Sequence, residues 1–148
     1  MSERAFQDHW PHFTCWGCGM HNPDGLRIKS YWDGDEGVCT FHPQRTHMAN
    51  GDLLNGGIMA TILDCHSVCT ASATLFRAEG RALDSDPRID VVTASIKVDY
   101  LRPTAMTAPI LLRAHVREIS GKKITVTCTA SVDDRETARS EGLFIRVA

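Results

Sequence analysis

The sequence predicts an α+β domain in which an antiparallel sheet wraps around one long central helix. Apolar residues recur at helical spacing from Ile58 onward, whereas the stretches after residue 90 alternate between apolar and polar residues, as strands do. The chain of 148 residues is long enough for one domain with a substantial core. A hairpin, a long helix and then long strands, in that order, indicate a helix packed on one face of a sheet.

The N-terminal part of the chain is expected to be irregular. Residues 1–25 are rich in aromatic residues and histidine and end in the turn signal Asn22-Pro23-Asp24-Gly25. We expect them to form a cap segment, with a single domain over residues 26–148. Within that domain, residues 26–32 alternate like a strand, residues 33–37 are a hairpin turn, and residues 38–41 form the return strand.

A long helix is expected over roughly 55–78, packed on more than one side. Large apolar residues form one stripe along the expected helix. A second stripe consists of the small residues Ala60, Ser67 and Ala71 together with Asp64. The large stripe consists of Ile58, Ile62, Cys65, Cys69 and Phe76. After a loop rich in Gly, Asp and Pro, strands are expected over residues 91–101, 110–118, 124–132 and 138–147.

Composition and charge exclude several classes of protein. The net charge of −2 and the lack of a basic stretch interleaved with aromatics argue against a nucleic-acid partner. No uninterrupted apolar run reaches the length of a membrane span, and the first residues lack the apolar core of a signal peptide. We therefore expect a cytoplasmic protein without a membrane partner, whose 6 cysteines are reduced.

The start of the helix carries the strongest chemical signal. Gly56 and Gly57 let a ligand approach the backbone, where free N–H groups and the helix dipole favour a developing negative charge. Asp64 lies two turns further along an apolar helix, so its carboxylate must be paired, exposed in a cleft or used in chemistry. Together these residues predict a site that stabilises an oxyanion near a carboxylate.

The cysteine motifs are interpreted as structural. Cys65 and His66 are adjacent, and side chains about 100° apart on a helix do not readily hydrogen-bond to each other. Cys15 and Cys18, with His21 nearby, resemble half of a zinc site, but a structural zinc needs four ligands. No second Cys or His pair has suitable spacing, so we expect no metal.

Three sets of residues resemble the PaaI-like acyl-CoA thioesterases of the hotdog fold, over roughly residues 13–147. The resemblance implies the hotdog fold, an acyl-CoA substrate, no cofactor, and a homodimer or a dimer of dimers with its sites at the subunit interface. The matching segments are Cys15-Trp16-Gly17-Cys18-Gly19 with Asn22 to Leu26, Leu54-Asn55-Gly56-Gly57-Ile58 to Asp64, and Val98-Asp99-Tyr100-Leu101-Arg102-Pro103 followed by Gly121-Lys122.

The resemblance also implies roles for individual residues. The N–H of Gly56 would bind the thioester oxygen, and Asp64 of the other subunit would attack the thioester or activate a water. Thr93, counted back from Pro103, would orient that water from the neighbouring subunit. Asn55 stands where the family usually has histidine; its amide can orient a water or support the oxyanion, but it cannot shuttle a proton.

Further positions are candidates for substrate contacts. Gly57 and Asn50 lie near the glycine motif, and basic residues at a turn and at a strand end could contact the phosphates of CoA. The basic residues are Arg102, Lys122 and Lys123, and Gly121 belongs to the same turn as the two lysines. Two other functions stay open. A non-catalytic acyl-CoA or acyl-carrier binding protein fits the loss of the usual histidine, and a hotdog hydratase or dehydratase would need a histidine base that the motif lacks.

Overall fold

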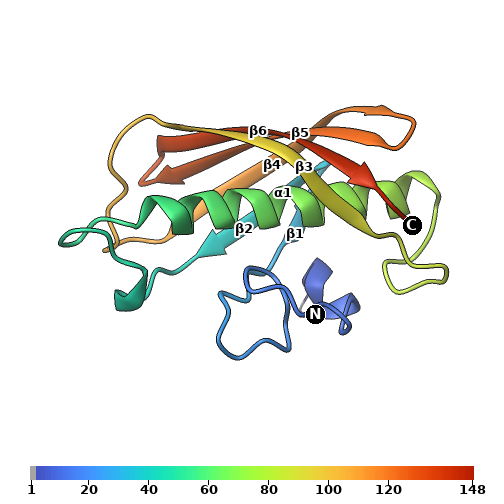
Figure 1. Ribbon diagram of the computed structural model, residues 1–148, viewed down its shortest axis with the longest axis horizontal. Coiled ribbons are helices and arrows are strands. Elements are labelled where there is room, and N and C mark those ends of the chain that lie inside the picture. The colour runs from blue at the N-terminus through green and yellow to red at the C-terminus, as the bar shows by residue number, and fades with distance from the viewer. Residues whose placement is uncertain (1–2) are drawn as a thin grey trace.

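The computed structural model describes residues 3–148 and contains one long helix against one antiparallel sheet (Figure 1). Helix α1 (Gly56–Ala78) packs on a six-stranded sheet with strand order β1-β2-β4-β5-β6-β3. The predicted α+β architecture is therefore confirmed. The strands are β1 (Tyr31–Asp33), β2 (Glu36–Phe41), β3 (Val91–Tyr100), β4 (Ile110–Ser120), β5 (Lys123–Val132) and β6 (Arg135–Arg146). Two short 3-10 helices, η1 (Phe6–His9) and η2 (Arg45–His47), lie before α1.

Strand β1 is shorter than predicted. We expected a strand over residues 26–32, but only Tyr31–Asp33 pairs with β2. The backbone before β1 bonds to the cap segment instead, where the N–H of Leu26 donates to the carbonyl oxygen of Trp16 at 2.8 Å. A φ of 49° at Arg27 also interrupts the extended backbone. Alternation in the sequence cannot reveal this competition, because the competing partner lies in another segment.

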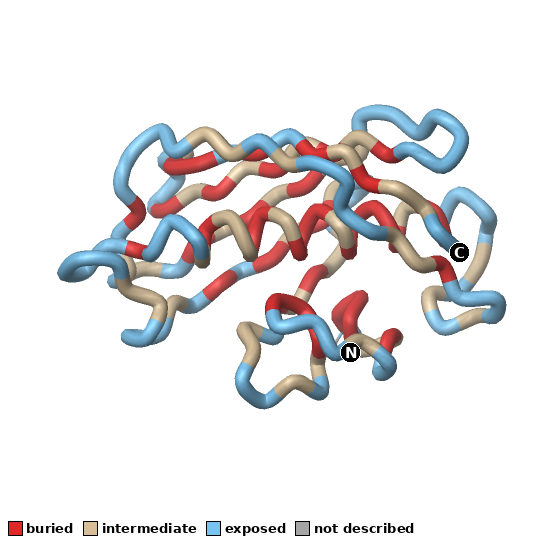
Figure 2. Tube along the Cα trace, viewed as in Figure 1, coloured by how far each residue is buried: buried red, intermediate tan, exposed pale blue. Residues whose placement is uncertain are grey.

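Helix α1 is buried on two sides, as its stripes predict. Ile62 and Cys69 on the large stripe and Ala71 on the small stripe are all fully buried. Buried positions follow the helix along most of its length (Figure 2). The sheet covers one side, and the cap segment approaches another, where the ring of Trp10 stacks on Phe76 with centroids 6.5 Å apart. The cap therefore shares one hydrophobic core with the rest of the domain.

The apolar character of α1 is explained by this packing. By length and composition alone, the helix could cross a membrane. In the fold, however, 67% of its apolar stretch is buried inside the protein, as expected for a core helix. Polar residues such as Asp64 and His66 interrupt the apolar stretch, so the length of uninterrupted apolar runs does not mark this helix in the sequence.

A buried polar network joins α1 to the cap. The Nε2–H of His66 donates to the carbonyl oxygen of Gly37 at 2.8 Å, and Nδ1 accepts from the hydroxyl of Ser30 at 2.8 Å. Ser30 in turn bonds to Gln7 of η1. Burial lowers the pKa of His66 to about 4, so the ring is neutral. Both ring nitrogens are engaged, which confirms that His66 is structural and not a partner of Cys65.

Candidate active site

Asn55 is the N-cap of α1. Its Oδ1 accepts from the N–H of Gly57 at 2.8 Å and from the N–H of Ile58 at 3.3 Å, which satisfies two free donors of the first turn. Gly57, a predicted substrate contact, therefore donates to Asn55. The side-chain oxygen of Asn55 is turned back on the helix, and its Nδ2 amino group is the part that remains for a ligand.

Gly56, the first residue of α1, lies beside Tyr100 at the end of β3. The hydroxyl of Tyr100 donates to the carbonyl oxygen of Gly56 at 2.7 Å. A hollow of about 430 Å³ adjoins the two residues and is also lined by Met59 and Arg102. The exposed N–H end of the helix thus borders an open space, as an oxyanion site requires. Tyr100 was not among the site residues predicted from the sequence, and its contact with Gly56 is a finding of the structure.

Asp64 is paired with Thr93. The hydroxyl of Thr93 donates to Oδ1 of Asp64 at 2.8 Å, from β3 to α1. Burial raises the pKa of Asp64, and the hydrogen bond from Thr93 opposes that rise. The carboxylate is half-buried on a largely apolar helix, with one oxygen held and the other left for a reacting atom.

The pairing of Thr93 differs from the expectation. We expected Thr93 to act from the neighbouring subunit, but the structure pairs it with Asp64 of its own chain. A β-bulge contributes, because the register of β3 against β6 shifts between Thr93 and Ser95. Bulges turn a side chain away from simple alternation, and here the strand crosses α1 within the same chain.

Gly56 and Asp64 of one chain lie too far apart to act on the same carbonyl. They are separated by eight residues of continuous helix, which corresponds to about 12 Å along the axis. An oxyanion donor and an attacking group must both lie about 3 Å from the reacting atoms. The predicted oxyanion donor and the predicted carboxylate therefore lie in two separate places of one chain. We call these places the Gly56 half-site, with Tyr100, and the Asp64 half-site, with Thr93.

The predicted substrate contacts near the helix start fall in two places. Arg102 lines the hollow beside Gly56, which puts a cation next to the predicted oxyanion site. Asn50 is exposed in the loop before α1 and is not among the residues that line this hollow. The structure thus brings Arg102, but not Asn50, to the Gly56 half-site.

The turn that carries Gly121, Lys122 and Lys123 lies near the start of β3, at the opposite end of this strand from Tyr100. Gly121 adopts a φ of 60° in the turn between β4 and β5, and Lys123 begins β5. The carbonyl oxygen of Lys122 accepts from the N–H of Arg146, which pairs with Val91 at the start of β3. This turn is therefore near the end of β3 that carries Thr93.

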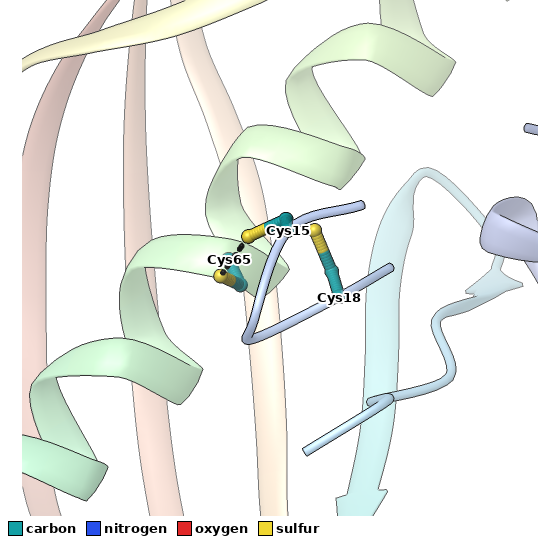
Figure 3. Close-up of side chains that lie close together, drawn as sticks. All are labelled: Cys15, Cys18 and Cys65. Atoms are coloured by element: carbon teal, nitrogen blue, oxygen red, sulfur yellow. Dashed lines mark hydrogen bonds between the residues drawn. The ribbon is translucent and has the colours of Figure 1, made fainter. Parts of the chain in front are cut away.

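The cysteines of the cap converge with a cysteine of α1. The sulfur atoms of Cys15, Cys18 and Cys65 all lie within 4.8 Å of one another (Figure 3). Hydrogen bonds from Cys18 and Cys65 hold the pKa of the Cys15 thiol far below its usual range, and the same contacts raise the pKa of the other two. Sequence spacing offered no second Cys or His pair for the Cys15–Cys18 motif, but the fold of the cap over the helix brings the single Cys65 to it.

The helix wrapped by this sheet is a hotdog fold. The sequence model of the thioesterase superfamily matches residues 51–139. A solved thioesterase superfamily protein from Shewanella loihica is 31% identical, with a TM-score of 0.66, over 82% of this chain and 91% of that chain. The PaaI protein of the E. coli phenylacetic acid degradation operon has a similar fold at 15% identity, with a TM-score of 0.67, over 83% of this chain and 81% of that chain.

The chain belongs to the thioesterase superfamily. It is also similar to acyl-coenzyme A thioesterase THEM4 of Bos taurus, at 26% identity over 87% of this chain and 49% of that protein. The chain spans about half the length of the curated relatives that it matches. The predicted family and fold are therefore confirmed.

Proposed function

We propose that the protein hydrolyses acyl-CoA thioesters at a site shared by two copies of the chain. The observation that carries this proposal is the hydrogen-bonded pair of Asp64 and Thr93 on an apolar helix whose N-terminus borders an open hollow. Membership of the thioesterase superfamily and the similarity to an acyl-coenzyme A thioesterase support the reaction and the substrate class. No metal or organic cofactor is needed for this chemistry.

Two copies are required because the half-sites are about 12 Å apart in one chain. Strand β3 is at the edge of the sheet, and an edge strand can pair with a second copy. An antiparallel pair of β3 strands with its two-fold axis near Ile96 sets Val92 of one copy opposite Tyr100 of the other. Val92 and Tyr100 are the large exposed apolar residues of this strand. Tyr100 contacts Gly56, and Thr93 contacts Asp64, so this pairing joins complementary half-sites.

The proposed mechanism assigns a separate task to each half-site. The N–H of Gly56 stabilises the negative charge that develops on the thioester oxygen. Asp64 of the other copy acts through Oδ2 as nucleophile or as the base that activates water, while Thr93 fixes Oδ1. If Asp64 acts as the base, it takes a proton from the attacking water, the carbon–sulfur bond breaks, and that proton passes to the sulfur, so that CoA leaves as the thiol. If Asp64 acts as the nucleophile, CoA leaves first as the thiolate, and water then hydrolyses the acyl–Asp64 anhydride, which releases the acid and restores the carboxylate.

The CoA phosphates would bind at basic residues around the shared site. Arg102 borders the Gly56 hollow, and Lys122 and Lys123 lie toward the end of β3 that carries Thr93. In the paired arrangement, these residues of opposite copies approach the same site. Guanidinium and ammonium groups provide the charge-assisted hydrogen bonds that phosphates require.

The direct test is release of free CoA thiol from a panel of acyl-CoA substrates. Asp64→Asn keeps the size of the side chain and the bond from Thr93 but removes the base and nucleophile. We expect turnover to fall by about 100-fold or more, with folding unchanged. The matched control is Asp35→Asn, an exposed acid in the turn between β1 and β2. An Asp64→Asn enzyme with most of its turnover would place the chemistry elsewhere.

A non-catalytic acyl-CoA binding protein is the second candidate, and the position of Asn55 favours it. The side-chain oxygen of Asn55 caps α1, in a position where the resembling family usually carries histidine. Binding of acyl-CoA without thiol release by the wild-type chain would support this second function. A hydratase is less suited to the site, because His66, the histidine nearest to Asp64 in the sequence, is buried with both nitrogens engaged.

A further inference from the structure

A cluster of cysteine sulfur atoms lies between the cap segment and α1, outside the proposed catalytic machinery. Cys15 and Cys18 come from the cap loop, and Cys65 comes from the helix (Figure 3). Cys69 follows one helical turn after Cys65 and is also buried. Three thiols from two distant segments thus converge at one point, and a fourth lies one helical turn away on α1. The sequence motif Cys-x-x-Cys alone supplies only two of them.

The spacing of the sulfur atoms suits a metal ion better than a disulfide. The sulfur atoms of Cys15 and Cys65 are 3.7 Å apart, whereas a disulfide bond is about 2.05 Å long. Zinc binds thiolate sulfur at about 2.3 Å in a tetrahedron, so two ligand sulfurs are then about 3.8 Å apart. The observed separation therefore corresponds to one edge of a tetrahedral zinc–thiolate site.

The backbone of the cap loop is built to bring these thiols together. A Cβ atom at Gly17 would lie 2.2 Å from the sulfur of Cys65 and 3.0 Å from a methyl carbon of Thr61. Only glycine lets the loop come this close to the helix. The N–H of Gly19 donates to the carbonyl oxygen of Cys15 at 2.8 Å and closes the loop around the two cysteines.

The four cysteines differ in their exposure to solvent. Cys18, Cys65 and Cys69 are buried, and Cys15 is exposed. A soft divalent cation could enter past Cys15 and would then be shielded from water by the other three thiols. Such a site would release the thiol protons on binding and would compensate the buried thiolates that result.

We propose that Cys15, Cys18, Cys65 and Cys69 bind one zinc ion that fastens the cap segment to α1. Four thiolates leave no open position on the metal, so the zinc is structural. It joins residues that are 50 positions apart in the sequence, on the same turn of α1 that carries Asp64. The proposal does not depend on thioester hydrolysis, and either one can fail without the other.

Metal analysis of the full chain, purified without chelator or added reductant, tests the proposal. We expect about one zinc per chain, and we expect Cys18→Ser and Cys65→Ser to lose it. The control is Cys128→Ser, which removes a buried thiol of the core outside the cluster and should keep the zinc. Purified wild-type chain without zinc that also fails to bind added zinc would overturn the proposal.

A cobalt titration keeps the test decisive if the cysteine variants fail to fold. Cobalt(II) bound to the wild-type chain should give the intense sulfur-to-cobalt absorption of a tetrahedral thiolate site, and one equivalent of zinc should abolish it. Replacement of Cys69 by serine should weaken this band and lower zinc affinity by about 100-fold. A disulfide among these cysteines in freshly isolated protein, with no cobalt absorption after reduction, would instead indicate a redox role and contradict the zinc site.

Discussion

At the scale of single residues, Asn55 combines two tasks at one position. Its oxygen caps α1 through Gly57 and Ile58, and its amino group faces the same helix terminus as the N–H of Gly56. The capping role accounts for a small polar residue here without any catalysis. A substitution that preserves the cap but changes the charge can therefore separate the two roles.

We predict that Asn55→Asp keeps the stability of the protein but lowers turnover by about 10-fold or more. Aspartate caps a helix about as well as asparagine, whereas its negative charge opposes the oxyanion at Gly56. The comparison variant Asn55→Ala should lose about 1 kcal/mol of unfolding free energy, because two N–H groups lose their acceptor. Urea unfolding and thiol release measure the two effects. Full turnover in Asn55→Asp would show that the residue is only a cap.

The candidate site was predictable where it depends on local sequence. The helix start at Gly56 and the carboxylate at Asp64 follow from glycine chemistry, helical spacing and the family resemblance. Tyr100 and Gly56 are 44 residues apart in the sequence. Strand alternation predicts which face of the sheet a residue is on, but it does not predict which distant residue its side chain contacts. The core position of Cys65 is confirmed, but its contact with Cys15 was not predictable, because no local pattern specifies how the cap folds over α1.

At the scale of elements, the buried ring of His66 joins the cap segment, α1 and β2 through hydrogen bonds. The ring is neutral in the folded chain because burial lowers its pKa to about 4, whereas an unfolded histidine titrates near 6.5. Stability from this group is therefore fully present above pH 6.5 and is lost as the pH falls toward 4. The hydroxyl of Ser30 can no longer donate to Nδ1 when the ring gains its second proton.

We predict that protonation of His66 lowers the free energy of unfolding by about 3 kcal/mol between pH 7 and pH 4. Denaturant unfolding at pH 7 and at pH 4 measures this difference in unfolding free energy. His66→Gln should be less stable at pH 7 but should show a pH dependence that is weaker by about this amount. The control His42→Gln, at an exposed histidine, should behave like the wild type. Equal pH dependence in His66→Gln and the wild type would contradict the neutral buried ring.

The elements that the sequence predicted well are those with strong local periodicity. Helix α1 begins at Gly56, directly after its cap, and β5 follows the alternation of residues 124–132 closely. The stretch of residues 26–30 also alternates, yet it bonds to the cap instead of extending β1. Its sequence is compatible with a strand, and only the tertiary partner decides the outcome.

At the scale of the whole molecule, the chain has one sheet edge that matches its two half-sites. Within residues 3–148, strand β3 pairs only with β6, and Val92 and Tyr100 on it are exposed. The outer face of the sheet, by contrast, is lined by charged and polar residues such as Lys97, Arg117 and Glu141. This contrast favours a dimer formed through β3, whose two symmetric sites each take Gly56 from one copy and Asp64 from the other.

We predict that two inactive variants recover activity when they are mixed. Gly56→Pro removes the oxyanion N–H at the first helical position, where proline is well tolerated after the extended backbone of Asn55. Asp64→Asn removes the carboxylate. When the two variants are unfolded together and refolded at equal concentrations, half of the dimers contain one copy of each. Each mixed dimer has one intact site, so thiol release should reach about a quarter of the wild-type rate. A third variant, Val92→Lys, should abolish the recovery by placing a charge at the proposed β3 interface, whereas Ile119→Lys, at an exposed apolar residue of β4, should not. If sedimentation confirms that the refolded mixture is dimeric but no activity returns, Gly56 and Asp64 do not meet across the interface.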